Sequence, residues 1–200
     1  SDKADNAFCA VRPPGHHAEP NRAMGFCLFN NVAIAAEYAR LHHKLDRVAI
    51  VDFDVHHGNG TQAAFYRQPK VLYASSHEMP HYPGTGFPSE TGLGNIINAP
   101  LAAGDTGAEF RKKYEDLIFP SIIDFKPDLL LISAGFDAHK DDPLASIRLV
   151  EDDYYWVTHR LMEIAAQTCK GRIVSVLEGG YNLKALAASV AVHVKALMGG

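Results

Sequence analysis

The sequence predicts an α/β fold in which a mainly parallel β-sheet is flanked by helices on both faces. Short apolar, β-branched runs alternate along the chain with longer segments of helical periodicity, a pattern typical of βαβ units. Three of these runs are followed directly by Asp, His or Tyr side chains. Because ligands of parallel sheets bind beyond the carboxyl ends of the strands, these side chains are expected to meet at one edge of the sheet.

The composition describes one globular domain, which we expect to span residues 1–200. The chain is 47% hydrophobic and 21% charged, which is enough apolar material for a full core. Its net charge of -4 and pI of about 6.2 provide no basic surface for nucleic acid. Three widely spaced cysteines favour a reducing cytoplasm over a disulfide framework. No apolar run reaches the roughly 18 residues of a membrane span, so we expect a soluble protein.

The first segments lead to a loop and a helix. A polar lead at residues 1–6 precedes residues 8–17, where two prolines and a glycine exclude a helix and fix the position of a histidine pair. Asn30 then provides a helix start for residues 32–43, whose Ala, Ile, Tyr and Leu spacing forms an apolar face.

A buried strand is expected at residues 48–53, closed by a glycine-containing loop. Because side chains alternate along a strand, Asp52, Asp54 and His56 should project to one side and form a site. A short helix near residues 61–66 follows.

The middle of the chain begins with a strand at residues 71–76. Residues 77–100 are rich in proline and glycine, which predicts a long ordered loop, and such loops are commonly functional. Residues 107–125 have helical periodicity, with a break expected at Pro120.

The last third repeats the strand and helix alternation. Strands are expected at residues 127–135 and 172–177, and helices at residues 152–169 and 183–197. The sequence has no internal repeat, linker or shift in composition, which is why we expect a single domain.

Six segments, in this order, share the pattern of one family: Arg12-Pro-Pro-Gly-His16-His17-Ala18, Gly25-Phe26-Cys27, Asp52-Phe-Asp54-Val-His56-His57-Gly-Asn59-Gly60, Tyr82-Pro-Gly-Thr-Gly86, Ser133-Ala-Gly-Phe-Asp137 and Glu178-Gly-Gly-Tyr181. They resemble the histone deacetylase family of metal-dependent amidohydrolases, in particular its bacterial members and its class II branch. The resemblance spans residues 9–181 and implies the arginase/deacetylase-like fold.

The resemblance implies a catalytic zinc ion bound by Asp54, His56 and Asp137. Three protein ligands with an exchangeable position are the arrangement of catalytic zinc sites. The resemblance also implies a potassium ion near the carbonyls of Asp52, Asp54 and His56, with contributions from Ser75 and Ser76, and a second, weaker cation site near Phe65 and Val71.

The paired histidines would lie beside the water that attacks the substrate. The resemblance implies that His17 is the general base and that His16 acts more through its charge. Asp52 would orient His16, and Asn59 would orient His17. An amide at Asn59 resembles the class II pattern and should leave His17 less basic than a carboxylate would.

Tyr181 matches the family tyrosine whose hydroxyl donates to the oxyanion of the transition state. Gly179 and Gly180 would permit the close backbone approach of this turn, with Gly180 next to the substrate.

Phe26 and Tyr82 match the aromatic pair that lines the family's acyl-lysine tunnel. Gly25 would leave its carbonyl accessible to the substrate amide. The implied reaction is the hydrolysis of an acetyl or acyl group from a lysine side chain or a related amine, with acetate as a product. Acetyl-lysine peptides, acetylated proteins and acetylpolyamines are the implied substrates.

Two alternatives use the same residues. The run from Asp137 to Pro143 superficially resembles a binuclear metal run of arginase-like ureohydrolases, although Val55 separates ligand residues and a second acid-rich run is missing. The other alternative is an acyl-lysine binding module that has no turnover, against which the intact set of ligands, histidines and tyrosine argues.

The family's catalytic domain normally has a sizeable portion before the paired histidines. In this sequence the pair begins at His16, close to the first residue. We therefore expect either a fragment or a minimal version of the domain with a more open cleft. An unpaired sheet edge or exposed apolar surface is expected in both cases, and either oligomerisation or a partner segment could cover it.

Overall fold

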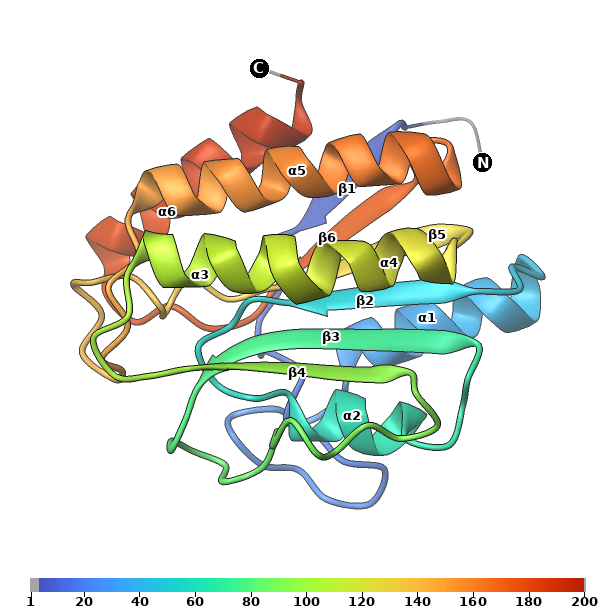
Figure 1. Ribbon diagram of the computed structural model, residues 1–200, viewed down its shortest axis with the longest axis horizontal. Coiled ribbons are helices and arrows are strands. Elements are labelled where there is room, and N and C mark those ends of the chain that lie inside the picture. The colour runs from blue at the N-terminus through green and yellow to red at the C-terminus, as the bar shows by residue number, and fades with distance from the viewer. Residues whose placement is uncertain (1–3, 200) are drawn as a thin grey trace.

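A computed structural model describes residues 4–199, so the first three residues of the expected polar lead lie outside the described part. Its centre is a single six-stranded sheet in the order β1-β6-β5-β2-β3-β4, and every neighbouring pair is parallel (Figure 1). The strands are β1 (Asn6–Cys9), β2 (Val48–Asp52), β3 (Val71–Glu78), β4 (Ile96–Leu101), β5 (Leu129–Ala134) and β6 (Ile173–Leu177). The predicted fold class is confirmed.

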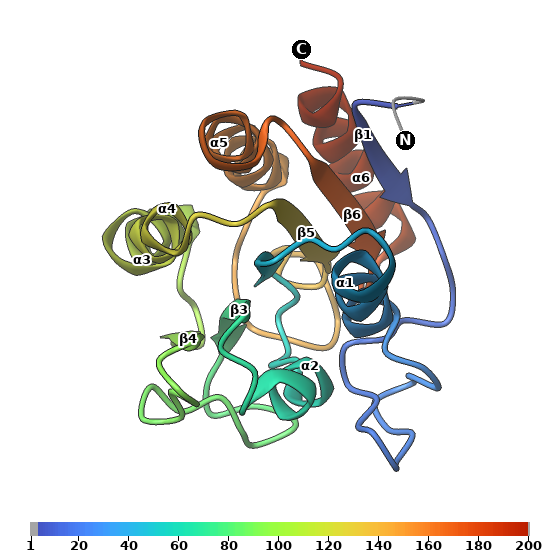
Figure 2. The same ribbon diagram turned by 90° about the vertical axis from the view of Figure 1, so that its right-hand side faces the viewer.

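Helices cover both faces of the sheet (Figures 1 and 2). One face packs against α1 (Asn31–His42) and α2 (Asn59–Phe65). The other face packs against α3 (Gly107–Lys113), the π-helical turn η1 (Tyr114–Ile118), α4 (Phe119–Phe125), α5 (Glu151–Cys169) and α6 (Leu183–Leu197). Burial of these two apolar layers supplies the main driving force for folding, at roughly 25 cal/mol per Å² of apolar surface.

The strand register aligns the ends of the central strands. Asp52, the last residue of β2, pairs with Ser75 of β3 and with Ser133 of β5. All five residues of β2 are buried, as expected of a parallel strand covered on both faces. The loops that leave β2, β5 and β6 therefore start at the same edge of the sheet.

Both edge strands differ from the sequence-based expectation. Residues 8–17 were expected to be a loop, but β1 occupies Asn6–Cys9 and pairs with β6. Residues 77–100 were expected to be one loop, but β3 extends to Glu78 and β4 begins at Ile96. Both predictions were wrong for the same reason, because a short edge strand depends on its neighbour for pairing, and an edge also tolerates the proline in β4.

The break expected at Pro120 is found directly before it. The α-helical pattern ends at Lys113, the π-helical turn η1 follows, and α4 begins at Phe119 with Pro120 in its first turn. The chain stays helical through this turn, so the proline produces an irregular turn and no gap. The predicted cap of α1 is confirmed, because the Asn30 side chain accepts a 3.0 Å hydrogen bond from the Ala33 N–H.

The expected exposed apolar surface lies on α1. Ile34, Tyr38 and Leu41 follow one another at helical spacing and are 57%, 55% and 70% exposed. Among residues 4–199, the helices are too short or too polar to cross a membrane.

Candidate active site

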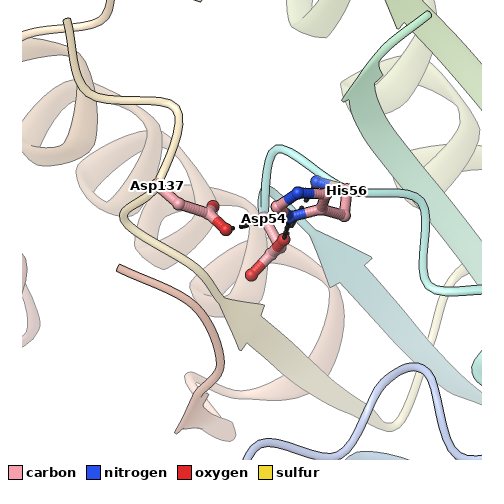
Figure 3. Close-up of side chains that lie close together, drawn as sticks. All are labelled: Asp54, His56 and Asp137. Atoms are coloured by element: carbon pink, nitrogen blue, oxygen red, sulfur yellow. Dashed lines mark hydrogen bonds and ion pairs between the residues drawn. The ribbon is translucent and has the colours of Figure 1, made fainter. Parts of the chain in front are cut away.

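Three candidate metal-ligand side chains meet at the edge of the sheet where β2 and β5 end (Figure 3). Asp54, His56 and Asp137 are buried, and each offers one ligand atom within 4.8 Å of the others. His56 Nδ1 lies 3.1 Å from Asp54 Oδ1 and 3.0 Å from Asp137 Oδ2. Two carboxylates and an imidazole, all buried, are a donor set that suits zinc.

Strand alternation is not what brings these ligands together. The strand β2 ends at Asp52, and the chain then turns so that Asp52 Oδ1 accepts from the Asp54 N–H at 3.1 Å. The Asp54 carboxylate in turn accepts from the His56 N–H at 2.9 Å. Of the three side chains predicted to converge, Asp54 and His56 do so because of this hydrogen-bonded turn, whereas Asp52 lies outside the group and contacts His16.

The ligand group holds opposite charges next to one another. Burial raises the pKa of Asp137 to about 6, helped by the charge of Asp54. Burial would lower the pKa of His56, but hydrogen bonds to Asp137 and Asp54 raise it to about 10. The buried carboxylates therefore favour a positive charge beside them, and a metal ion bound there would displace the imidazole proton.

Two glycines make room for the ligand group. A Cβ at Gly135 would collide with the Asp54 carboxylate, and a Cβ at Gly179 would collide with Asp137 Oδ2. The Gly179 N–H also donates to Asp54 Oδ2 at 2.8 Å. The backbone after β5 and after β6 thus encloses the carboxylates as closely as sterics allow, which fits a preorganised metal site.

The two histidines of the pair lie in contrasting surroundings beside this group. Their rings are 4.1 Å apart, and both are buried. His16 Nδ1 lies 3.0 Å from Asp52 Oδ2, whereas His17 Nδ1 lies 2.8 Å from the amide oxygen of Asn59. These are the partners that the family resemblance implies.

The partners set the two pKa values apart. Burial lowers the pKa of His16, but the charges of Asp52, Asp54 and other carboxylates outweigh it and raise that pKa well above its usual value. Burial and the neighbouring His16 lower the pKa of His17 to about 3. The pair therefore offers one cationic and one neutral imidazole at neutral pH.

Sequence reasoning assigned no role to Glu178, although it lies inside a quoted segment. Its Oε2 accepts from the N–H groups of Gly15 at 2.7 Å and His16 at 3.1 Å, and its Oε1 accepts from the Ser133 hydroxyl at 2.9 Å. Burial raises its pKa to about 7. Glu178 thus ties the histidine loop to the ends of β5 and β6, and an acidic residue directly after a buried strand was the available signal.

Aromatic side chains lie next to the histidines and Tyr181. The Tyr82 ring lies 5.1 Å from His17 and 6.2 Å from His56, between ring centroids. The Phe26 ring lies 6.1 Å from Tyr181 and is 70% exposed. Burial raises the pKa of Tyr181, and the charges of Asp137 and Asp54 raise it further, so the phenol keeps its proton.

Gly25, directly before Phe26, packs against the His17 ring. Gly25 has a φ of +56°, and a Cβ there would collide with the His17 ring. Its carbonyl accepts from the Cys27 thiol at 3.2 Å. Gly180 has a φ of +136°, so the turn before Tyr181 also requires a glycine.

Comparison with known proteins identifies this constellation. The sequence pattern of the histone deacetylase domain matches residues 1–197. The chain belongs to the histone deacetylase family. It is 48% identical to "Histone deacetylase 10, chloroplastic" of Oryza sativa subsp. japonica, over 96% of this chain and 44% of that protein. It is 41% identical to "Histone deacetylase-like amidohydrolase" of Pseudomonas aeruginosa, over 90% of this chain and 49% of that protein.

The fold comparison agrees with the sequence comparison. The solved structure described as "Crystal Structure of HDA15 HD domain" superposes with a TM-score of 0.91 at 40% identity, covering 98% of this chain and 58% of that one. The chain thus spans about half the length of these histone deacetylase relatives.

The structure also bears on the ureohydrolase alternative. In this member of the histone deacetylase family, the run after Asp137 does not join the metal group, which comprises Asp54, His56 and Asp137 among residues 4–199. Asp142 is directed instead to three backbone N–H groups, those of Leu144, Tyr181 and Asn182.

Two further histidines contact the loop of Tyr82: His57, which lies inside a quoted family segment but was given no role, and His77, which was not singled out from the sequence. His57 Nδ1 lies 2.7 Å from Thr85 Oγ1, and His77 Nε2 lies 2.9 Å from the carbonyl of Gly86. Both histidines are buried, and burial lowers the pKa of His57 to about 2 and that of His77 to about 4. They act as neutral hydrogen-bonding groups beneath this loop.

The side chains and carbonyls expected at the two cation sites form hydrogen bonds within the protein. Ser75 Oγ lies 3.0 Å from His77 Nδ1, and Ser76 Oγ lies 3.1 Å from the Tyr114 hydroxyl. At the second expected site, the carbonyls of Phe65 and Val71 both accept from the side-chain amide of Asn95, at 2.9 and 2.8 Å. The second, weaker cation site near these two carbonyls stays a prediction.

Proposed function

We propose that this chain carries the catalytic machinery of a zinc-dependent deacetylase, acting as a single catalytic domain. The reaction is hydrolysis of an acetyl or acyl amide on a lysine side chain or a related amine, with acetate as a product. One observation carries the proposal, which is the buried group of Asp54, His56 and Asp137 with a cationic and a neutral histidine directly beside it.

Asp54, His56 and Asp137 would hold the zinc ion. Bound there, zinc would polarise the amide carbonyl and lower the pKa of a water molecule from about 16 towards 7. The enclosing Gly135 and Gly179 backbone would fix both carboxylates before substrate arrives, so that little reorganisation is needed during the reaction.

His17 would act as the general base. Its imidazole is neutral at pH 7 and is oriented by Asn59, so it can accept the proton of the attacking water. His16, held cationic by Asp52, would stabilise negative charge in the transition state and favour proton delivery to the departing amine.

The Tyr181 hydroxyl would donate a hydrogen bond to the carbonyl oxygen of the substrate, which becomes negative during attack. Its raised pKa keeps the proton on the phenol throughout the working pH range. Phe26, Tyr82 and Gly25 would bind the apolar stem of the substrate, and Gly180 would permit its close approach. Removal of one oxyanion donor typically costs about 2.7–4 kcal/mol of activation free energy.

Four further attributes of the protein are proposed, each from one feature: its class, a potassium ion, its compartment and its oligomeric state. The amide of Asn59 supports a class II-like site, in the manner of bacterial members of the family. A structural potassium ion would use the carbonyls of Asp52, Asp54 and His56 together with Ser75 and Ser76. The free thiols of Cys9, Cys27 and Cys169 suit a reducing compartment such as the cytoplasm. The exposed apolar face of α1 would favour a homo-oligomer.

The test is an assay of the metal-quantified chain against an acetyl-lysine peptide, an acetylpolyamine and a longer acyl-lysine peptide. We expect acetate release from at least one acetylated substrate and its loss on chelation. Tyr181→Phe should lower turnover by roughly 10²- to 10³-fold while metal content stays unchanged. The matched control is Tyr66→Phe, a tyrosine just after α2, which should leave turnover unaltered.

Two outcomes would count against the proposal. Near-wild-type turnover of Tyr181→Phe would remove this residue from the mechanism. Full metal content without hydrolysis of any substrate, combined with measurable binding of the acetyl-lysine peptide, would favour a binding module.

A further inference from the structure

Asp142 is a buried carboxylate that contacts the backbone of Tyr181. It lies on the loop after β5, five residues beyond the ligand Asp137, and only 7% of it is exposed. Its Oδ2 accepts from the N–H of Tyr181 at 2.8 Å and from the N–H of Asn182 at 3.3 Å. Its Oδ1 accepts from the N–H of Leu144 at 3.0 Å, so both oxygens are engaged within the protein.

The backbone around Tyr181 needs such an anchor. On the N-terminal side, Gly180 has a φ of +136°, a conformation that leaves the chain few steric restraints of its own. On the C-terminal side, Asn182 caps α6, because its side chain accepts from the N–H groups of Lys184 and Ala185, both at 3.1 Å. Tyr181 lies between the glycine and the cap, and Asp142 fixes the amides on either side of its carbonyl.

Asp142 also joins two loops that must stay in register. The Asp142 loop leaves β5 with the ligand Asp137, whereas the Tyr181 loop leaves β6. The Asn182 side chain adds a second link, since its Nδ2 donates to the carbonyl of Asp141 at 2.9 Å. Charge-assisted hydrogen bonds of this kind are roughly twice as strong as neutral ones. A change at Asp142 would therefore move the tyrosine relative to the metal group.

We propose that Asp142 is the positioning residue for Tyr181, so that its carboxylate holds the tyrosine hydroxyl at the oxyanion and sets kcat more than KM. The inference rests on the proposed role of Tyr181 in deacetylation. Asp142 is not itself a ligand or a catalytic residue. Its effect reaches the reaction only through Tyr181, and this distinguishes positioning from a general contribution to stability.

The experiment uses the full chain loaded with zinc and an acetyl-lysine peptide. Asp142→Asn keeps the size of the side chain, but its amide NH2 group cannot accept from a backbone N–H, and loss of the negative charge weakens the bonds that its remaining oxygen makes. We expect kcat to fall roughly 10- to 100-fold, with KM within about threefold and metal content unchanged, because a small misplacement of a transition-state donor is costly. In the Tyr181→Phe background, Asp142→Asn should lower kcat by less than about twofold.

Asp128→Asn is the matched control. The Asp128 carboxylate also accepts from two backbone N–H groups, those of Asp46 and Arg47, both at 3.0 Å, but it lies just before β5 begins. This variant loses bonds of the same kind far from the carboxyl ends of the strands. We expect it to lower the unfolding midpoint without lowering kcat.

Hydrogen exchange of the Tyr181 amide supplies a readout that needs no activity. We expect this amide to be protected in the wild-type chain and to exchange at least about tenfold faster in Asp142→Asn. An unprotected Tyr181 amide in the wild type would overturn the inference even if the variant did not fold. An equal loss of kcat in the wild-type and Tyr181→Phe backgrounds would also overturn it, since the effect would then be general. If the chain has no turnover, the proposed function fails, whereas the exchange measurement still decides whether Asp142 holds Tyr181.

Discussion

The molecule buries histidines in two regions where their partners differ. At the carboxyl ends of the strands, His56 lies about 3 Å from the carboxylates of Asp54 and Asp137. Between α5 and the sheet, His193 of α6 is at least as buried, but its nitrogens face hydroxyls: Thr158 Oγ1 at 2.7 Å and Ser175 Oγ at 2.9 Å. Burial disfavours the imidazolium in both regions.

The partners decide the outcome. Burial alone lowers the pKa of His193 to about 4, so this histidine is neutral at pH 7. Two carboxylates more than offset burial at His56 and raise its pKa to about 10. The carboxylates at the edge of the sheet thus favour a positively charged histidine, whereas the hydroxyls in the helical layer do not offset burial.

The strongest way to break this contrast is Asp137→Asn. The substitution removes one of the two carboxylates between which a cation is held, while preserving the size of the side chain. We expect bound zinc to fall from about one ion per chain to near zero and turnover to fall by more than about 10³-fold, since the metal supplies several kcal/mol of transition-state stabilisation. Metal analysis after dialysis and an acetate-release assay measure the two effects.

Asp128→Asn again supplies the control, because it makes the same chemical change at a carboxylate that binds only backbone N–H groups. It should retain zinc. One zinc ion per chain in Asp137→Asn would show that zinc binding does not require both the Asp54 and Asp137 carboxylates.

The helical layer is tested by the pH dependence of stability. His193 has a pKa of about 4 when folded and about 6.5 when unfolded, so the unfolded chain binds the additional proton between these values. Its contribution to stability is therefore present above pH 6.5 and is lost as the pH falls, amounting to roughly 2 kcal/mol by pH 5. His193→Gln should remove this part of the loss, leaving a shallower decline from pH 7 to pH 5 in urea unfolding.

The range above pH 7.5 provides the internal reference, because His193 is neutral there in both states. The difference between variant and wild type should be constant in that range and should shrink or reverse below pH 6. Parallel curves down to pH 5 would mean that His193 is not the proton-linked group.

The sequence was sufficient to predict the central strands and the site residues that follow them, but not the two edge strands of the sheet. Central strands such as β2 are continuous apolar runs that end in ligand residues, and both signals are local. The edge strands β1 and β4 were missed because their conformation depends on pairing with β6 and β3, which no local pattern encodes.

The same distinction applies within the site. The pairs of His16 with Asp52 and His17 with Asn59 were expected from a family pattern, and the geometry places each pair in contact. The roles of Glu178 and Asp142 were not expected, because each carboxylate binds backbone N–H groups more than 35 residues away in sequence. Such acceptors become visible only when the loops are folded together.

The smallest expected effect comes from giving His17 a carboxylate partner of the kind that raises the pKa of His56. Asn59→Asp would replace the amide beside His17 with a carboxylate, and an opposite charge within hydrogen-bonding distance favours the imidazolium. The pKa of His17 should rise, so the acid limb of the kcat/KM profile should move to higher pH by about one unit. The new carboxylate would also face Glu19, which now accepts from the Asn59 amide at 2.8 Å. Combining Asn59→Asp with Glu19→Gln restores a donor at that position and should keep the shift while recovering stability. An acid limb that stays in place in both variants would show that a base other than His17 controls it.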